Sequence, residues 1–312
     1  MGKKSNYVIT GAAGFIGSHL VNFFLSKKFT VIAIDNQKYG NWLNLIKSKN
    51  LKVINNDINN ISKNQLKKIF NQNTILIHLA AEKHNNSLHN PEIMFRTNCI
   101  ATNKLFKVAA ENRVKKIIFS SSLYSYGYIH PPSMKENMTC DPKTAYGISK
   151  LAGEQLLKMN CAKYEIKYSI LRFFFVYGPK QMNGKGYPSV IVKNFERIRK
   201  NESPIICNDG KQIMDYIYID DVIQVIFKCC KSLNNEFFNV SSGKGISIIN
   251  LVKLMLRVSG RKLNIIYAGN DWTKNTYRVG NNSKVTKNFK WRPVVNLKHG
   301  LKKIWKSMVQ ND

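Results

Sequence analysis

The chain has 312 residues, 44% of them hydrophobic, and its 49 basic and 18 acidic residues give a net charge of +31 at pH 7. A chain of this length can bury a sizeable core in one large or two modest domains. No apolar run approaches the ~20 residues of a membrane-spanning helix, and the first residues lack a signal-peptide pattern, so we expect a cytoplasmic protein with no membrane partner.

Short apolar runs alternate with amphipathic stretches along the first half of the chain, which is typical of a parallel sheet covered by helices. Strands are predicted, in chain order, at Asn6–Thr10, Thr30–Ile34, Leu51–Asn55, Ile75–Leu79, Lys116–Ser120 and Tyr168–Phe174. Helices are predicted between them at His19–Lys27, Lys63–Phe70, Phe95–Glu111 and Ala145–Cys161. This order predicts an α/β fold with a Rossmann-type doubly wound parallel sheet.

The rest of the chain is predicted to form a smaller C-terminal α/β cap. Residues 179–215 and 241–312 are richer in turns, whereas Tyr216–Lys231 between them has the pattern of a strand followed by a helix. We therefore expect residues 1–178 and 216–240 to form the sheet domain. Residues 179–215 and 241–312 are expected to form the cap.

A glycine-rich turn links the first strand to the first helix. Residues 10–17 read Thr-Gly-Ala-Ala-Gly-Phe-Ile-Gly, with a glycine at every third position. Such a turn lets the backbone approach a pyrophosphate, and the following helix directs its N–H groups and dipole at the anion. The strand before the turn and the apolar-faced helix after it are the context that this motif requires. The predicted dinucleotide contacts here are Gly11, Ala13, Gly14, Phe15, Ile16 and Gly17.

Acidic residues follow the second and third predicted strands. Asp35 lies 18 residues beyond Gly17, where a carboxylate accepts hydrogen bonds from both ribose hydroxyls and repels a 2′-phosphate. With Asn36 beside it, Asp35 favours NAD over NADP; the other interpretation of Asp35 is a helix cap or turn former. Asp57 and Ile58 are placed to bracket the adenine, although Asp57 is as well explained as a turn residue.

The chain resembles the extended short-chain dehydrogenases/reductases, and more narrowly their NAD-dependent sugar epimerase/dehydratase group, of the UDP-glucose 4-epimerase type. The motifs that carry this resemblance, in order, are Thr10–Gly17, His78-Leu79-Ala80-Ala81, Ser120-Ser121-Ser122, Tyr146-x-x-x-Lys150 and Leu171-Arg172…Val176-Tyr177-Gly178-Pro179. The similarity continues through Asp209–Asp221 and Trp291–Leu301 and so covers nearly the whole chain. It is specific for the superfamily and much less so for the substrate.

The resemblance implies further cofactor contacts. The implied set is Leu79, Ala80, Ala81, Lys83, Asn98, Ser120, Tyr146, Lys150 and Phe173. Residues 79–81 would present backbone along the NAD, Lys83 would reach its phosphates, and Asn98 would order the helix beside the ribose. Judged from the residues alone, Asn98 is also consistent with an ordinary helix position.

Tyr146 and Lys150 lie four residues apart on a predicted helix and therefore share one face. An unperturbed tyrosine, with a pKa of about 10, is a poor base at neutral pH, but the Lys150 ammonium and the positive ring of NAD⁺ would lower that pKa. The phenolate could then take a proton from a sugar hydroxyl while hydride passes to the nicotinamide. By resemblance Ser122 is the catalytic serine that shares this hydrogen bond. A surface Tyr/Lys pair is the alternative.

Two positions depart from the pattern of the 4,6-dehydratases in this group. Those enzymes carry an adjacent Asp-Glu pair directly after the catalytic Ser/Thr, and the same positions here are Leu123 and Tyr124. A leucine cannot transfer a proton, so that dehydration route lacks its acid and base. The pattern favours 4-epimerisation or simple ketone reduction. Glu82 and His84 are either other proton-transfer groups or loop residues near the cofactor.

Substrate contacts are predicted at Ser122, Tyr124, Tyr146, Phe175 and Arg278. The family's usual Asn before Val-Tyr-Gly-Pro is Phe175 here, and its usual Arg before Asp-x-x-Tyr is Met214. Loss of that arginine removes a charge-assisted contact worth about 1.5–3 kcal/mol. Arg278 is then the predicted diphosphate ligand, which Lys185 or Lys211 could assist. The departures indicate a differently seated or different nucleotide sugar, or a chain that no longer binds substrate.

These features together predict an enzyme, a NAD-dependent nucleotide-sugar epimerase that acts at C4 of a UDP-sugar through a transient 4-keto intermediate. The sheet domain would bind NAD and the cap would bind the substrate. The alternatives are an NDP-sugar 4,6-dehydratase, an NAD(P)H-dependent 4-ketoreductase and, remotely, a non-catalytic NAD-binding regulator. The family resemblance also implies a homodimer through the helices Phe95–Glu111 and Ala145–Cys161.

The charge and the cysteines predict no further partner. Only nine of the 49 basic residues are arginines, and the lysines are scattered along the chain. We therefore expect a solvated basic surface and no specific nucleic-acid partner; weak polyanion binding or steering of an anionic substrate is the alternative. The six cysteines show no Cys-x-x-Cys spacing, which predicts reduced packing residues and no metal site.

Overall fold

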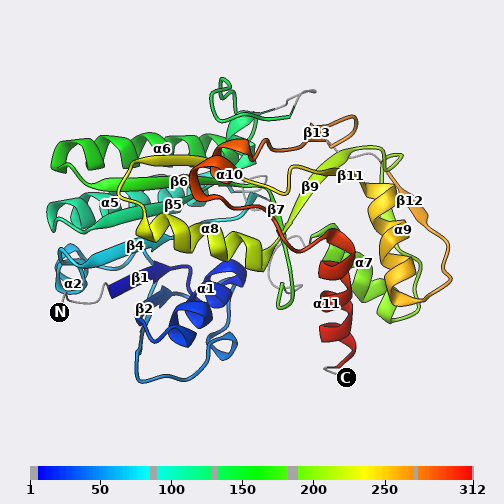
Figure 1. Ribbon diagram of the computed structural model, residues 1–312, viewed down its shortest axis with the longest axis horizontal. Helices are drawn as coiled ribbons and strands as arrows, with labels where there is room; N and C mark the ends of the chain where they lie inside the picture. The colour runs from blue at the N-terminus through cyan, green and yellow to red at the C-terminus, as the bar shows by residue number, and fades with distance from the viewer. Residues whose placement is uncertain (1–5, 85–89, 128–132, 182–188, 270–272, 311–312) are drawn as a thin grey trace. The chain divides into compact units, whose positions relative to one another are not determined.

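The computed structural model describes residues 6–84, 90–127, 133–181, 189–269 and 273–310 (Figure 1). The chain forms two compact units. The first comprises Met1–Gly127, Thr139–Arg172 and Ile223–Phe238, and the second Tyr128–Met138, Phe173–Val222 and Asn239–Asp312. In the part of the chain that the structure describes, no helix has the length and apolarity to cross a membrane. Which unit binds which ligand stays a prediction.

A seven-stranded sheet forms the centre of the first unit, with strand order β10-β6-β5-β4-β1-β2-β3. Its strands are β1 (Asn6–Thr10), β2 (Thr30–Asp35), β3 (Leu51–Asn55), β4 (Thr74–His78), β5 (Lys116–Ser122), β6 (Lys167–Phe173) and β10 (Glu236–Val240). The pairs β1–β2, β1–β4, β2–β3 and β4–β5 are parallel. This order confirms the predicted Rossmann-type sheet. The order reverses between β1 and β4, where such folds bind ligands at the carboxyl ends of the strands.

Helices cover the apolar strands of this sheet. They are α1 (Phe15–Ser26), α2 (Lys63–Ile69), α4 (Pro91–Phe95), η2 (Arg96–Ala101), α5 (Thr102–Glu111), α6 (Ala145–Tyr164) and α8 (Ile219–Lys231), with short 3-10 turns η1 (Trp42–Asn44) and η3 (Leu123–Tyr126). Every residue of β4 and β5 is buried, as expected of parallel strands covered on both faces. Helices α5 and α6 run side by side (Figure 1) and share one core with these strands, to which Phe106, Ala109 and Leu157 contribute.

The described residues of the second unit form short strands and helices. The strands are β7 (Phe175–Tyr177), β8 (Ile205–Cys207), β9 (Ile213–Tyr218), β11 (Gly245–Ser247), β12 (Ile266–Ala268) and β13 (Tyr277–Arg278). The helices are α7 (Val190–Arg199), α9 (Ile248–Ser259), α10 (Ser283–Phe289) and α11 (Leu297–Val309). Strand β9 pairs antiparallel with β11 and parallel with β7 and β13.

A buried carboxylate organises the strand ends around β9. Asp215 is fully buried and accepts hydrogen bonds from the N–H groups of Ser242, Gly243 and Gly280 and from the Ser242 hydroxyl. Burial raises the pKa of Asp215 to about 6, while these hydrogen bonds act in the opposite direction. Asp215 therefore connects β9 to the turn before β11 and to the residues that follow Arg278.

Three sequence-based boundaries need correction. The first helix begins at Phe15, four residues before the predicted start, because Gly14 is already its N-cap. The predicted helix Phe95–Glu111 is interrupted by a π-helical turn, η2, between α4 and α5. The segments described as turn-rich also contain α7, α9, α10 and α11, since their apolar residues recur at helical spacing between turns.

Candidate active site

The glycine-rich turn leaves the carboxyl end of β1 and enters α1. Gly11 has φ of +69°, and a Cβ there would lie 2.7 Å from the backbone nitrogen of Ala80, so the position requires glycine. The N-cap of α1 is Gly14, which has no side chain to accept from the first-turn N–H groups. These N–H groups and the positive end of the helix dipole suit a diphosphate. The turn therefore fits the diphosphate of NAD.

Asp35 is the last residue of β2 and lies against this turn. Its Oδ2 accepts from the Ala13 N–H at 2.9 Å, and its Oδ1 accepts from the Gln37 N–H at 2.7 Å. Burial raises the pKa of Asp35, and the backbone hydrogen bonds oppose that rise. A carboxylate held at this strand end suits the ribose hydroxyls of NAD and repels the 2′-phosphate of NADP.

Asp57 and Ile58 follow β3 and lie near the residues that follow β2. Asn36 Nδ2 donates to Asp57 Oδ2 at 2.6 Å, and Asp57 Oδ1 accepts from the backbone and side-chain nitrogens of Asn59 at 2.8 and 2.7 Å. Ile58 is buried. The turn interpretation thus describes the contacts that Asp57 makes within the protein, and the adenine contact stays a prediction.

The ends of β1, β4 and β5 are joined by hydrogen bonds. The Leu79 N–H donates to Thr10 O at 3.1 Å, and the Ala80 N–H to Thr10 Oγ1 at 3.3 Å. Ser120 Oγ donates to His78 O at 3.0 Å. The backbone of Leu79 and Ala80, which is predicted to run along NAD, is therefore held in place by β1.

Ser122, Tyr146 and Lys150 come together where β5 ends and α6 begins. The Ser122 side chain hydrogen-bonds Tyr146, and Ser122 Oγ also accepts from the Tyr124 N–H at 3.3 Å. Lys150 Nζ donates to Ser120 O at 2.9 Å and lies 5.7 Å from the centroid of the Tyr146 ring. This geometry places a hydroxyl on Tyr146 and an ammonium beside its ring.

Burial dominates the electrostatics of this group. It raises the pKa of Tyr146, a rise that the hydrogen bond from Ser122 opposes, and it lowers the pKa of Lys150 to about 8. Within the protein alone, burial thus holds the phenol protonated; the lowering of its pKa by Lys150 together with the positive ring of NAD⁺ stays a prediction. Burial acts in this way because removing both groups from water penalises both of their charged forms.

Aromatic rings surround Tyr146. The Tyr124 ring centroid lies 5.7 Å from that of Tyr146, and the His84 ring lies 4.4 Å from Tyr124 and 6.0 Å from Tyr146. Leu123, at the position of the dehydratase acid, is 2% exposed. A buried apolar side chain thus replaces the acid, and His84 is the remaining titratable neighbour that the sequence suggested for proton transfer.

A polar network that the sequence did not predict lies behind the predicted cofactor residues. Asn98 accepts from the Glu82 N–H at 2.8 Å and donates to Ser149 Oγ at 3.1 Å, and Ser149 Oγ donates to Tyr146 O at 2.8 Å. The Glu82 carboxylate accepts hydrogen bonds from Lys38 and Tyr39. Both oxygens of the Glu82 carboxylate are therefore occupied by hydrogen bonds within the protein, which argues against its alternative role in proton transfer.

No local pattern could have revealed this network, because Tyr39 and Glu82 are 43 residues apart and Asn98 and Ser149 are 51 apart. Lys83, predicted to reach the phosphates, has its Nζ 4.5 Å from the centroid of the Tyr39 ring, and burial lowers its pKa.

The predicted substrate residues Phe175 and Arg278 belong to the second unit. Phe175 on β7 pairs in register with Tyr216 of β9, and Arg278 on β13 pairs with Met214 of β9. Arg278 therefore lies directly across from the position of the family's missing arginine, and it is 3% exposed.

The other predicted contacts to place are Phe173, Lys211 and Lys185. Phe173, the predicted cofactor residue, is buried at the end of β6. Lys211 is exposed and pairs with Asp209 at 3.7 Å. Lys185 lies outside the residues that the structure describes.

Known proteins resemble the chain over its whole length. The model of the NAD dependent epimerase/dehydratase family matches residues 7–241. A putative UDP-glucose 4-epimerase of Methanocaldococcus jannaschii is 32% identical over 98% of this chain and 99% of its own length. A solved UDP-N-acetylglucosamine 4-epimerase from Methanobrevibacter ruminantium, in complex with UDP-N-acetylmuramic acid, superposes with a TM-score of 0.93 at 30% identity, covering 99% of this chain and 100% of that one. The UDP-glucose 4-epimerase of Thermus thermophilus in complex with NAD has a TM-score of 0.88 at 25% identity, covering 97% and 99%.

Proposed function

The chain belongs to the NAD dependent epimerase/dehydratase family, and on that premise we propose that it is a NAD-dependent UDP-sugar 4-epimerase. The observation that carries this proposal is the grouping of Ser122, Tyr146 and Lys150 beside a buried Leu123. A tyrosine hydroxyl serves proton transfer at one hydroxyl, whereas dehydration needs an acid where Leu123 stands. Interconversion at C4 through a transient 4-keto sugar needs only proton transfer by the tyrosine hydroxyl.

In the proposed reaction Tyr146 removes the proton of the 4-hydroxyl and later returns it to the ketone oxygen. The glycine-rich turn and Asp35 would hold NAD, which would supply reversible hydride transfer at C4. Ser122 hydrogen-bonds the reacting oxygen, and the Lys150 ammonium together with the positive nicotinamide favours the phenolate against the cost of burial. Rotation of the 4-keto sugar between the two hydride transfers inverts C4.

We assign the second unit to the substrate and Arg278 to its diphosphate. A guanidinium can bind a phosphate with two parallel hydrogen bonds. Because Met214 replaces the usual arginine, Arg278 has to bind the diphosphate without that second cation. Phe175 in place of a polar residue favours a sugar or diphosphate seated differently from that of UDP-glucose.

The experiment that tests the function incubates the purified protein with a panel of nucleotide sugars in D₂O. Products are separated by chromatography that resolves C4 epimers and are then weighed by mass spectrometry. We expect an epimer of unchanged mass that contains no deuterium, because hydride leaves and returns within the site. A product lighter by one water and carrying deuterium would instead identify a dehydratase.

Two alternatives have distinct outcomes in the same assay. A 4-ketoreductase would consume added NADH or NADPH in proportion to product. A NAD-binding regulator would retain NAD and convert no member of the panel, and Tyr146→Phe would change no activity.

Epimerase activity is expected to decline as the pH rises above about 8. Burial holds the pKa of Lys150 near that value, and loss of its charge weakens stabilisation of the phenolate, by up to about tenfold per pH unit. Stability moves the opposite way. Since the folded pKa is below the ordinary 10.5, the unfolded state binds more protons between pH 8 and 10.5, and the Lys150 contribution to the free energy of unfolding rises there. Profiles of kcat and of urea unfolding against pH check the two directions. Lys150→Met should remove both the fall in kcat and the rise in the free energy of unfolding above pH 8.

We also propose that the protein forms a homodimer through the helices of the first unit. Four large apolar side chains on these helices are exposed: Ile93 on α4, Ile100 on η2, and Ile148 and Met159 on α6. Ile100→Glu is expected to produce a monomer by light scattering coupled to size-exclusion chromatography, since it buries a charge in an apolar contact. Leu233→Glu is the matched control, because Leu233 and Ile100 are both 69% exposed. A wild-type monomer at micromolar concentration would contradict the proposal.

A reducing, cytoplasmic location is part of the proposal. All six cysteines are free of disulfides. Burial raises the pKa of Cys161 and Cys229 to about 12, which keeps these thiols protonated and unreactive.

A further inference from the structure

The loop that follows β2 crosses the glycine-rich turn. We call residues 36–41 the strap. In the sheet, β1 lies between β2 and β4. The strap begins after β2 and reaches Glu82, which follows β4, so it passes the end of β1, where the glycine-rich turn begins. The Asn41 N–H donates to Ala13 O at 3.1 Å, and a Cβ on Gly40 would lie 2.4 Å from that same oxygen.

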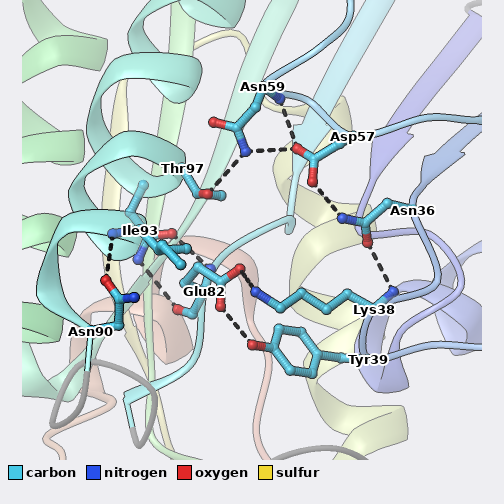
Figure 2. Close-up of polar contacts among 10 residues, drawn as sticks. Asn36, Lys38, Tyr39, Asp57, Asn59, Glu82, Asn90, Ile93 and Thr97 are labelled. Carbon is cyan, nitrogen blue, oxygen red and sulfur yellow. Dashed lines mark hydrogen bonds and ion pairs between the residues drawn. The ribbon is translucent and has the colours of Figure 1, made fainter.

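Lys38 and Tyr39 of the strap bind the Glu82 carboxylate, as Figure 2 shows. Lys38 Nζ forms an ion pair with Glu82 Oε1, and the Tyr39 hydroxyl donates to Glu82 Oε2 at 2.5 Å. The Glu82 side chain is 7% exposed, whereas that of Lys38 is 38% exposed. A largely desolvated carboxylate that accepts hydrogen bonds from an ammonium and a hydroxyl holds the strap more strongly than an exposed ion pair would.

Asn36, the first residue of the strap, binds Asp57, which follows β3. Asn36 Nδ2 donates to Asp57 Oδ2 at 2.6 Å, and Asn36 Oδ1 accepts from the Lys38 N–H at 2.9 Å. Asp57 in turn binds Asn59, whose side chain donates to Thr97 Oγ1 at 3.0 Å (Figure 2).

The residues that bind the strap, Glu82 and Asp57, are both connected by hydrogen bonds to the π-helical turn η2. Thr97 and Asn98 are neighbours in η2, and Asn98 holds the Glu82 backbone through its amide group, at 2.8 Å to the N–H and 3.3 Å to the carbonyl. The extra residue of a π-turn redirects side chains, and such turns occur frequently at functional sites. The same Asn98 binds Ser149, which hydrogen-bonds the carbonyl of Tyr146. The strap and the helix that carries Tyr146 are therefore held by a common support.

We propose that Glu82 is a positioning residue that holds the strap closed over the diphosphate of bound NAD and so slows the release of the cofactor. The inference rests on the proposed function, because an epimerase must keep one NAD through both hydride transfers. The dinucleotide of a Rossmann fold binds at the end of β1, which the strap crosses. Its departure then requires the contacts of Glu82 with Lys38 and Tyr39 to open.

The test measures NAD dissociation with no sugar present. Protein loaded with isotopically labelled NAD is diluted into excess unlabelled NAD, and the label that remains bound is followed over time. We expect Glu82→Gln and Lys38→Met each to raise the dissociation rate at least tenfold. The double variant is expected to be no faster than the faster single variant, because both changes break one interaction. Lys38→Arg retains the cation and is expected to stay within threefold of wild type.

Glu92→Gln is the matched control, since it removes an exposed glutamate paired with Arg96 in the same region. It is expected to leave dissociation within twofold of wild type. Dissociation unchanged by Glu82→Gln and Lys38→Met would overturn the proposal, and so would an equal acceleration by Glu92→Gln. Because no sugar takes part, failure of the proposed epimerase activity leaves this result readable on its own.

Discussion

Tyr146→Phe is expected to reduce kcat for C4 epimerisation by about 10³-fold or more. The substitution removes only the hydroxyl that Ser122 hydrogen-bonds, so no group remains to take the proton as hydride leaves C4. The ring keeps its contacts with Tyr124 and His84, at 5.7 and 6.0 Å between centroids, and the fold should be unchanged. Initial rates on the best substrate of the nucleotide-sugar panel, with NAD in excess, measure the effect.

Tyr124→Phe is the matched control for that measurement. It also removes one phenol hydroxyl from the same aromatic cluster, but Tyr124 is assigned to contact the sugar and not to transfer the proton. We expect an effect mainly on KM and a loss of less than about tenfold in kcat. If Tyr146→Phe retained more than a tenth of the wild-type kcat, the assignment of Tyr146 as the base would be wrong, and His84 would be the next residue to examine.

Glu154→Gln is expected to destabilise the protein by about 3–5 kcal/mol. Glu154 accepts from Arg172 Nε and Nη2 at 2.8 and 2.7 Å, and both side chains are almost fully buried, at 1% and 3% exposed. Glutamine leaves the Arg172 guanidinium desolvated without its counter-charge. The Ser121 hydroxyl, which donates to Glu154 Oε1 at 2.5 Å, loses a charged acceptor as well. Urea unfolding at pH 7 measures the change in free energy.

Two variants separate loss of the pair from loss of a charge in general. Glu92→Gln removes a glutamate from the exposed pair with Arg96 and is expected to cost about 0.5 kcal/mol or less. The double variant Glu154→Leu with Arg172→Met removes both buried charges and is expected to be more stable than Glu154→Gln alone. A cost below about 1 kcal/mol for Glu154→Gln would contradict the buried-pair argument.

Local sequence was sufficient to predict six of the seven strands in the sheet of the first unit; β10 was not predicted. Strands β1 and β3 have the predicted bounds, β2 and β5 differ from the prediction by one or two residues at the C-terminal end, and β4 and β6 by one residue at each end. Parallel strands covered on both faces are continuous apolar runs, which can be recognised without knowing the fold. The second unit was predicted only as an α/β cap, and the bounds of its helices were not predicted, because short amphipathic helices between many turns produce a weak periodic signal.

The π-turn η2 is a feature that sequence periodicity could not predict. Residues 95–111 have helical periodicity throughout, so a single helix was expected there. The backbone instead inserts one extra residue per turn at Arg96–Ala101, which places Thr97 and Asn98 toward partners at residues 59, 82 and 149. These partners come from separate elements, and only packing brings them to this turn.

The amino-acid sequence alone predicts the chemistry of the site: a glycine turn for a diphosphate, an aspartate for the ribose, a Tyr/Lys pair for proton transfer, and a leucine where a dehydratase has its acid. Each of these signals spans a few consecutive residues or one helical turn, so local geometry relates its members. The partners that surround them follow from the folded arrangement of distant segments. The attachment of the strap to Glu82, the support from Asn98, and the burial that raises the pKa of Tyr146 all depend on residues far apart in the chain. Such contacts form because the folded core excludes water, and no local pattern records which residues it brings together.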